Sequence, residues 1–156
     1  MLRGRPAFAS VYLCLVCLLS LLPPQLAAKP CTRDILRQVK VLVKLAPSLK
    51  SVDCRLYTPT IDDYQNCPSS TLKCFADEIK VLIEEWRTVR ILPRFTLNIS
   101  LTTLASKFNQ TESECRQCEL FREEEAENFL KGLQLTLEMM NSQHCVRIPP
   151  RRNYQN

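Results

Sequence analysis

Cysteine is the residue type in this chain best suited to chemistry, and the chain contains nine cysteines. Four of them stand as two pairs near expected helix starts: Cys67 and Cys74, and Cys115 and Cys118. A zinc site needs thiolates, which an oxidising compartment removes, and the spacing of the first pair is wide for metal ligands. A redox Cys-X-X-Cys site lacks the surrounding βαβ pattern. We therefore expect structural disulfides, although spacing alone leaves the pairing open.

The residue types of common enzyme sites are scarce. The chain has one histidine, His144, and only Gly132 of its two glycines lies outside the leader described below. Phosphate-binding loops and dinucleotide fingerprints need several glycines. A nucleophilic triad would have to use His144, which stands beside a cysteine and near a basic C-terminal segment, so we interpret it as a surface residue. We expect no catalytic residues, no metal site and no cofactor.

The N-terminal segment has the pattern of an export signal. A short basic stretch precedes the uncharged apolar run Ala7–Leu22, which is short for a membrane span, and small residues follow a Pro-Pro break. We expect residues 1–28 to be a signal peptide cleaved after Ala28, residues 29–146 to be the folded domain, and residues 147–156 to be a disordered basic tail. Cleavage leaves 19 basic against 16 acidic residues, a net charge of +3 that is too small to imply nucleic-acid binding. The product is expected to be secreted.

Four segments have the apolar periodicity of amphipathic helices, and little of the chain alternates like a strand. Their apolar faces lie within Ile35–Leu49, Phe75–Trp86, Leu97–Phe108 and Ala126–Met140. The residues that mark helix ends are Thr32 as a cap and Pro47 as a stop for the first helix, Ser69 as a cap and Pro93 as a stop for the second. The fourth helix is expected to run from Cys118 to about Gln143, because acids from Glu119 to Glu127 crowd its positive end.

The connections between these helices differ in length, and this difference favours one topology. The stretch from Lys50 to Pro68 is long enough to cross a bundle, and residues 109–114 stand where a second crossover is needed. We therefore predict an all-α, disulfide-stapled four-helix bundle with up-up-down-down topology. The ordinary up-down-up-down bundle is the alternative.

The predicted topology also brings two distant cysteines together. If the first and last helices are antiparallel neighbours, Cys31 at the start of one lies near Cys145 at the end of the other. A bridge there would be worth about 4 kcal/mol in the chain-entropy model. Cys31 cannot reach Cys54, because the intervening helix separates them by roughly 20 Å. Cys54 is therefore the odd thiol, and it is buried, modified or bonded to a partner chain.

The chain contains several short motifs in a specific order: Leu56-Tyr57-Thr58, Lys73-Cys74-Phe75 with Glu78, the run from Asn109 to Cys115, Cys118-Glu119 and Phe129-Leu130. In order and spacing these motifs resemble the interleukin-15 family. The resemblance implies the bridges Cys67 to Cys115 and Cys74 to Cys118. The cysteines at 31, 54 and 145 depart from the usual family pattern.

The resemblance also implies receptor-binding residues. Tyr57, Glu78, Glu85 and Glu119 match positions that the family uses against the basic face of an alpha receptor with a sushi-type domain. Asp34 is the candidate contact for the beta chain. Glu138 stands where the family has a glutamine that contacts the common gamma chain.

Two asparagines begin glycosylation sequons, Asn98-Ile99-Ser100 and Asn109-Gln110-Thr111. Asn98 matches a family asparagine that contacts the beta chain from the third helix, and a glycan there would obstruct that contact. Asn109 has no such conflict.

The predicted function is that of a secreted, monomeric cytokine that bridges alpha, beta and common gamma receptor chains, stimulates lymphocytes and is co-secreted with its alpha receptor. Such a ligand performs no chemistry of its own. The alternative is a saposin-like lipid-binding protein, which is also small, helical and rich in disulfides.

Overall fold

The computed structural model describes residues 31–109 and 114–145. The expected signal peptide and basic tail therefore lie outside the described residues. The elements follow in the order α2 (Arg33–Leu45), η1 (Ala46–Leu49), β1 (Arg55–Thr58), α3 (Ile61–Asn66), α4 (Pro68–Val89), α5 (Leu97–Ala105), η3 (Cys118–Leu120), β2 (Arg122–Glu125) and α6 (Ala126–His144). Among these elements, no helix is long and apolar enough to cross a bilayer.

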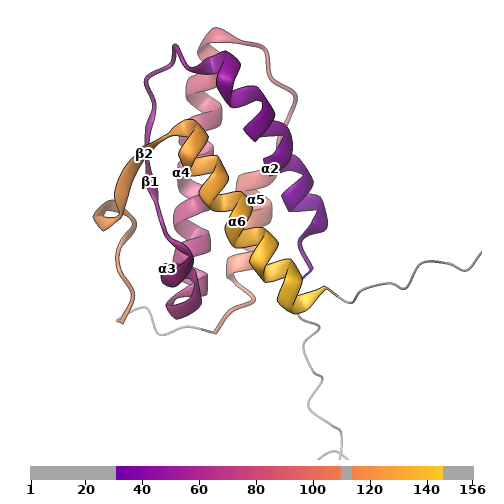
Figure 1. Ribbon diagram of the computed structural model, residues 1–156, viewed down its shortest axis with the longest axis vertical. Coiled ribbons are helices and arrows are strands. Elements are labelled where there is room, and N and C mark those ends of the chain that lie inside the picture. Colours follow the sequence, from indigo (N-terminus) through magenta and orange to yellow (C-terminus); the bar gives the residue numbers. More distant parts are fainter. Residues whose placement is uncertain (1–30, 110–113, 146–156) are drawn as a thin grey trace, which may run out of the picture.

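Helices α2, α4, α5 and α6 form a bundle with up-up-down-down topology (Figure 1). In Figure 1, α2 and α4 both run upward, and α5 and α6 both run downward. The packing follows this order, since α4 packs mainly on α5 and α2 mainly on α6. The predicted all-α bundle and its topology are confirmed, and the up-down-up-down alternative is wrong.

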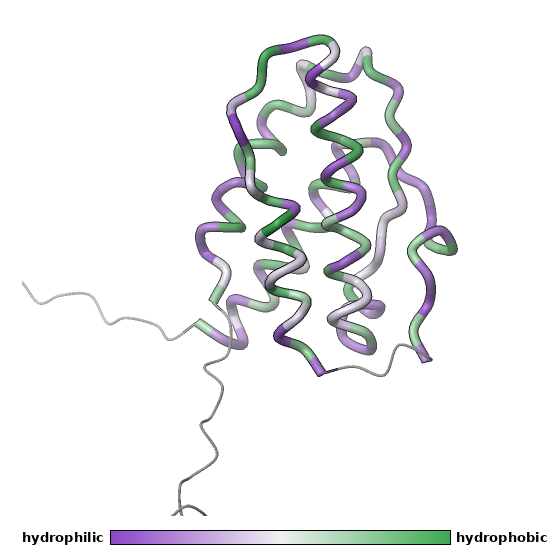
Figure 2. Tube along the Cα trace, turned by 180° about the vertical axis from the view of Figure 1, so that it is seen from behind, coloured by the Kyte–Doolittle hydropathy of each residue, from purple (hydrophilic) through white to green (hydrophobic). Residues whose placement is uncertain are grey.

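The interior of the bundle is made of the apolar faces that the periodicity predicts. Hydrophobic and hydrophilic residues alternate along the helices in Figure 2, as expected for helices that bury one side. The largest fully buried side chains are Trp86, Phe75 and Phe129, and the last two rings lie 5.5 Å apart. Burying a large apolar side chain contributes roughly 1.5–3 kcal/mol, so these faces supply the main stabilisation.

The fourth helix begins later than the acidic run predicts. Helix α6 starts at Ala126 rather than Cys118, and residues 122–125 form strand β2, which pairs antiparallel with β1. The register places Arg55 opposite Glu125 and Thr58 opposite Arg122. The strand pairing holds residues 122–125 in extended backbone, and only Glu127 remains in the first turn of the helix. Strands β1 and β2 form a two-stranded ribbon that joins the two crossover connections. The sequence did not predict this ribbon, because little of the chain alternates like a strand.

The first crossover also contains a short helix, α3, that periodicity did not indicate. Its start is fixed by a reciprocal cap: the Thr60 hydroxyl accepts the Asp63 N–H at 3.3 Å, and the Asp63 carboxylate accepts the Thr60 N–H at 2.8 Å. Helix α4 then begins with Pro68 in its first turn, so Ser69 lies inside the helix and is not its cap. The helix ends at Val89, before Pro93.

Three disulfides cross-link the bundle. Cys31 pairs with Cys145, Cys67 with Cys115, and Cys74 with Cys118, at Cα–Cα distances of 5.0, 5.9 and 5.2 Å. These bridges leave no thiolates for a zinc or redox site at the paired cysteines, and no cluster of metal-ligating side chains occurs in residues 31–109 and 114–145. Cys54 is free and buried.

The bridge from Cys31 to Cys145 lies beside a polar contact between the start of α2 and the end of α6. Thr32 precedes α2, yet its hydroxyl does not cap that helix. Instead the Thr32 N–H and hydroxyl both donate to Asn141 Oδ1, at 2.8 and 2.7 Å. The start of α2 is therefore fixed to the end of α6 by a covalent bond and two hydrogen bonds.

Candidate functional site

Strand β1 lies against α4 and brings Tyr57 to Glu78. The Tyr57 N–H donates to Glu78 Oε2 at 2.8 Å. Glu78 is half-buried, and Glu123 stands directly opposite Tyr57 in the ribbon. The backbone of one crossover, a side chain of α4 and a residue of the other crossover therefore meet at one place.

The bridge from Cys74 to Cys118 positions two more acids around this contact. Glu78 follows Cys74 by one helical turn on α4, and Glu85 follows Glu78 by two turns, so the three share one side of the helix. On the other side of the bridge, η3 contacts both α4 and β1, and it carries exposed Glu119. The structure thus gathers the four residues expected to face an alpha receptor.

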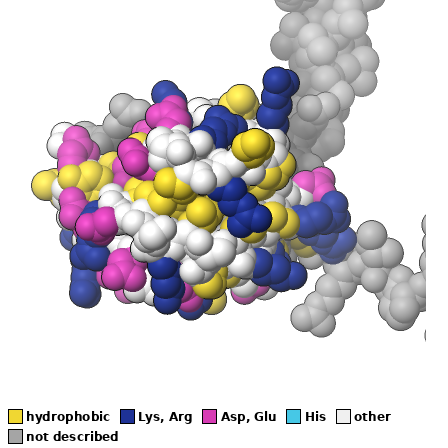
Figure 3. All heavy atoms as spheres, turned by 90° about the horizontal axis from the view of Figure 1, so that it is seen from above, with side chains coloured by type: hydrophobic (Ala, Val, Ile, Leu, Met, Phe, Trp, Pro, Cys, Tyr) yellow, Lys and Arg dark blue, Asp and Glu magenta, His cyan; other side chains and the backbone are white. Residues whose placement is uncertain are grey.

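Sequence reasoning missed Glu123 and Asp53 at this site. Glu123 was expected within the amino-terminal end of the last helix, and only its pairing with Tyr57 shows that it lies on a strand. We call the whole set the acidic surface, and its members are Asp53, Tyr57, Glu78, Glu85, Glu119 and Glu123. Within the part of the chain that the structure describes, none of its five carboxylates forms an ion pair. In Figure 3, Asp and Glu side chains gather on the left, the side of the ribbon in Figure 1, whereas Lys and Arg are more frequent on the opposite side.

The environment of the acidic surface raises the pKa of Glu78, which belongs to it, and the pKa of the nearby Cys54 thiol. Burial raises the pKa of Glu78, and the negative charges of Asp77 and Glu123 add to this, while the Tyr57 N–H opposes it. Burial, followed by the charges of Glu85, Glu78 and Asp53, raises the pKa of Cys54 to about 11. The Cys54 thiol is therefore neutral at physiological pH and poorly nucleophilic.

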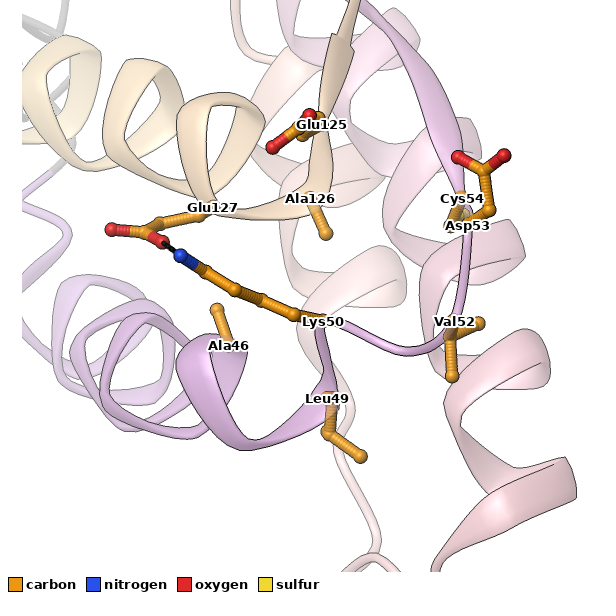
Figure 4. Close-up of a pocket in the computed structure, with 9 residues that line it drawn as sticks. All are labelled: Ala46, Leu49, Lys50, Val52, Asp53, Cys54, Glu125, Ala126 and Glu127. Carbon is orange, nitrogen blue, oxygen red and sulfur yellow. Dashed lines mark ion pairs between the residues drawn. The ribbon is translucent and has the colours of Figure 1, made fainter.

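A small cavity of about 290 Å³ lies where η1 meets the start of α6 (Figure 4). Lys50 reaches across it to Glu127, with 3.6 Å between Nζ and Oε2, and Cys54 forms part of its wall. His144 is at the far end of α6, about 27 Å along the helix from Ala126. The cavity therefore contains an ion pair and a neutral thiol, and its other charged lining residues are Asp53 and Glu125.

The other predicted receptor contacts lie apart from the acidic surface. Asp34 is exposed in the first turn of α2 and pairs with Arg37 at 3.5 Å. Glu138 on α6 accepts a hydrogen bond from Gln134 at 2.9 Å and pairs with Lys40 at 3.1 Å. Both contacts lower the pKa of Glu138, with the Gln134 hydrogen bond first, so the carboxylate stays ionised.

The two glycosylation candidates lie at opposite ends of α5. Asn98 is half-buried in its first turn, beside exposed Ile99. Asn109 is exposed after the helix end, and Thr111 of its sequon lies outside the described residues. Asn109 is thus the more accessible of the two side chains.

Comparisons with a family model and with individual known proteins point to the same family. A family model described as Interleukin 15 matches residues 12–141. Interleukin-15 of Oryctolagus cuniculus is 35% identical over 101 residues, which are 64% of this chain and 61% of the relative. Interleukin-15 of Cavia porcellus is 32% identical over 108 residues, 68% of this chain and 65% of the relative. The matched region spans less than two thirds of each relative's length, and no solved structure matches the chain.

Proposed function

The chain belongs to the interleukin-15 family, and from this premise we propose that it is a secreted cytokine that acts by binding cell-surface receptors. Export requires the signal peptide, residues 1–28, to be cleaved after Ala28. The acidic surface binds a basic alpha receptor with a sushi-type domain. The beta and common gamma chains then bind other faces of the bundle, and the bridged receptors stimulate lymphocytes.

The observation that carries this proposal is the acidic surface itself. Five carboxylates on four different segments lie near Tyr57 or Cys54, and no basic side chain is paired to them among the described residues. Unpaired carboxylates repel each other, so their grouping costs stability unless a partner supplies positive charge. Arginines of a receptor would donate charge-assisted hydrogen bonds to these carboxylates. Attraction between the opposite charges would also increase the association rate.

The surface is also held in place before any partner arrives. The Tyr57 N–H fixes the Glu78 carboxylate, and the bridge from Cys74 to Cys118 fixes η3 against α4. Ordering a side chain on binding costs roughly 0.5–1.5 kcal/mol, so a surface fixed in advance binds more tightly.

The remaining receptor contacts are proposed on α2, α5 and α6. Asp34 is available to a beta chain, because its exposed pair with Arg37 is worth at most about 1 kcal/mol and is easily exchanged. Glu138 would reach a gamma chain as a carboxylate already paired with Lys40, which weakens the contact relative to a free side chain. A glycan on Asn98 would block the beta chain, so we propose Asn109 as the glycosylated residue.

Co-expression with candidate alpha-receptor ectodomains, followed by pull-down under non-reducing conditions, tests the proposal. We expect a monomeric cytokine, co-secreted with a sushi-type receptor and with no intermolecular disulfide, because Cys54 is buried. The variant Glu85→Gln should weaken the complex about tenfold or more, since charged hydrogen bonds are worth roughly 1.5–3 kcal/mol. Glu84→Gln, an exposed neighbour on another side of α4, is the matched control.

Two outcomes would contradict the proposal. Equal loss in the Glu84 and Glu85 variants would show that only net charge matters. Binding to liposomes without receptor binding would favour the saposin-like alternative, which needs an open apolar cavity and not the closed core described above.

A further inference from the structure

The outer face of α2 carries a row of basic side chains that the proposed receptor contacts do not use. Arg33, Arg37, Lys40 and Lys44 recur at three- and four-residue steps and are all exposed. The row spans about 16 Å along the helix axis. The helix has four basic residues and one acid, so its net charge of +3 equals that of the whole chain after removal of the leader.

The charges of Arg37, Lys40 and Lys44 are weakly neutralised by the described residues. Arg37 pairs with Asp34 at 3.5 Å, but its side chain is 79% exposed. Lys40 pairs with Glu138 at 3.1 Å with 49% of its side chain exposed, and Lys44 forms no ion pair with any described residue. A shallow depression of about 370 Å³ lies among them, lined by the four basic side chains, Leu36 and Val41. Arg37 and Lys40 can therefore exchange their present partners for an external anion at little cost.

The shape of the face selects among anionic partners. Val39 and Leu42 are fully buried, and most other apolar residues of α2 are partly buried against the same core, so the helix has no free apolar face to insert into a membrane. The centre of a protein interface is usually apolar, and the basic row offers little apolar surface, namely Val41, which is 43% exposed, and half-buried Leu36. A linear, flexible polyanion needs only a row of cations, because its binding is driven by release of counterions.

We infer that the outer face of α2 binds a sulfated polysaccharide of the cell surface or extracellular matrix. Sulfate groups along the chain pair with Arg33, Arg37, Lys40 and Lys44, and the aliphatic stems around Val41 contact the sugar rings. The acidic surface lies on the other side of the bundle, where the ribbon is in Figure 1. The polysaccharide would therefore hold the protein through α2 and leave the acidic surface open.

A consequence for signalling rests on the proposed receptor function, whereas polysaccharide binding does not. Asp34 lies within the basic row, and Glu138 pairs with one member of it. Polysaccharide on α2 would thus cover the proposed beta-chain contact and leave alpha-receptor binding intact. The polysaccharide-bound protein would be held at the cell surface or in the matrix. In that form it would bind alpha receptor but would not bridge it to a beta chain.

The test measures binding of the full exported chain to immobilised heparin over a range of salt concentrations. With three or four ion pairs, affinity should fall roughly 20- to 100-fold between 50 and 200 mM salt. The variant Arg37→Gln/Lys44→Gln should bind about tenfold or more weakly at physiological salt, because each basic group near an anionic surface contributes about a factor of five. Desulfated heparin should bind neither protein.

The matched control is Lys80→Gln/Arg87→Gln. It also removes one lysine and one arginine seven positions apart on exposed helix surface, but on α4, which packs against α5 and not mainly against α2. A third variant, Arg151→Gln/Arg152→Gln, tests the basic C-terminal segment. We expect both controls to bind heparin within about threefold of the parent protein.

Several results would overturn the inference. These are no heparin binding at 150 mM salt, equal loss in the α2 and α4 variants, loss only in the C-terminal variant, or tighter binding to phosphatidylserine vesicles than to heparin. Capture of alpha receptor by heparin-bound protein tests the consequence separately. Loss of that capture with intact heparin binding would refute the separation of the two faces but not the polysaccharide site.

Discussion

Removal of the disulfide between Cys31 and Cys145 is expected to destabilise the bundle more than removal of any single surface contact. The variant Cys31→Ser/Cys145→Ser leaves the other two bridges in place. The two cysteines are 114 residues apart, but the bridge from Cys67 to Cys115 already shortens the path between them. With that bridge intact, the connecting path is about 66 residues long.

The chain-entropy model gives the magnitude. A closed loop of about 66 residues corresponds to roughly 4 kcal/mol at 25 °C, against nearly 5 kcal/mol if the other bridges were absent. The hydrogen bonds from Thr32 to Asn141 remain possible in the variant, so they do not add to the loss. For a domain of this size, 4 kcal/mol corresponds to a decrease in Tm of about 12–20 °C.

The assay is denaturant and thermal unfolding without reductant, after mass spectrometry has confirmed that the two remaining bridges are intact. Cys54→Ser, which removes a buried thiol that forms no bridge, is the matched control and should change stability much less. Alpha-receptor binding should be unchanged, because the acidic surface lies at the ribbon. A loss below about 1 kcal/mol would refute the entropic reasoning, and a loss of receptor binding by folded protein would show that the two regions are coupled.

Three further predictions concern single side chains. Because the pKa of Glu78 is raised in the folded state, this group adds stability as pH falls toward its ordinary value of 4.5. Glu78→Gln should therefore be more stable than the parent at pH 7, and this advantage should shrink between pH 7 and pH 4, as measured by urea unfolding of both proteins. Cys54 should resist iodoacetamide at pH 8 in the folded protein and react after denaturation, and equal rates by mass spectrometry would contradict its burial. Thr60→Ala should cost about 1 kcal/mol through loss of the α3 cap, whereas Thr88→Ala, an exposed threonine near the end of α4, should cost less in the same unfolding assay.

The helices could be predicted from sequence because their apolar faces repeat over many turns. Phe75, Ile79, Leu82 and Trp86 were expected on one face, and all four are buried. The topology followed from unequal connection lengths, since a long crossover permits parallel neighbours. Both inferences rest on long or repeated features, which the sequence shows directly.

The ribbon could not be predicted in the same way. Its strands have four residues each, too few for alternation to stand out, and β2 is one arginine followed by three glutamates. An acidic run before an apolar helix has the composition of a helix start, and only pairing with residues about 65–70 positions away makes it a strand. Glu123 was misplaced for this reason, although no local rule was violated.

The pairing of β1 with β2 has a consequence for the rate at which the molecule forms. Every rung of the ribbon joins residues about 65–70 positions apart, and the three bridges join residues 44, 48 and 114 positions apart. Contacts of such high sequence separation form only after large loops have closed, and closing these loops costs chain entropy. This cost slows folding even when local helices form quickly. We therefore predict that the acidic surface is among the last regions to assemble, and that repulsion between its carboxylates opposes that assembly. If the proposed alpha receptor is present during export, it would bind the folded protein and shift the folding equilibrium toward it. The yield of exported protein would then depend on the abundance of the receptor as well as on the stability of the chain.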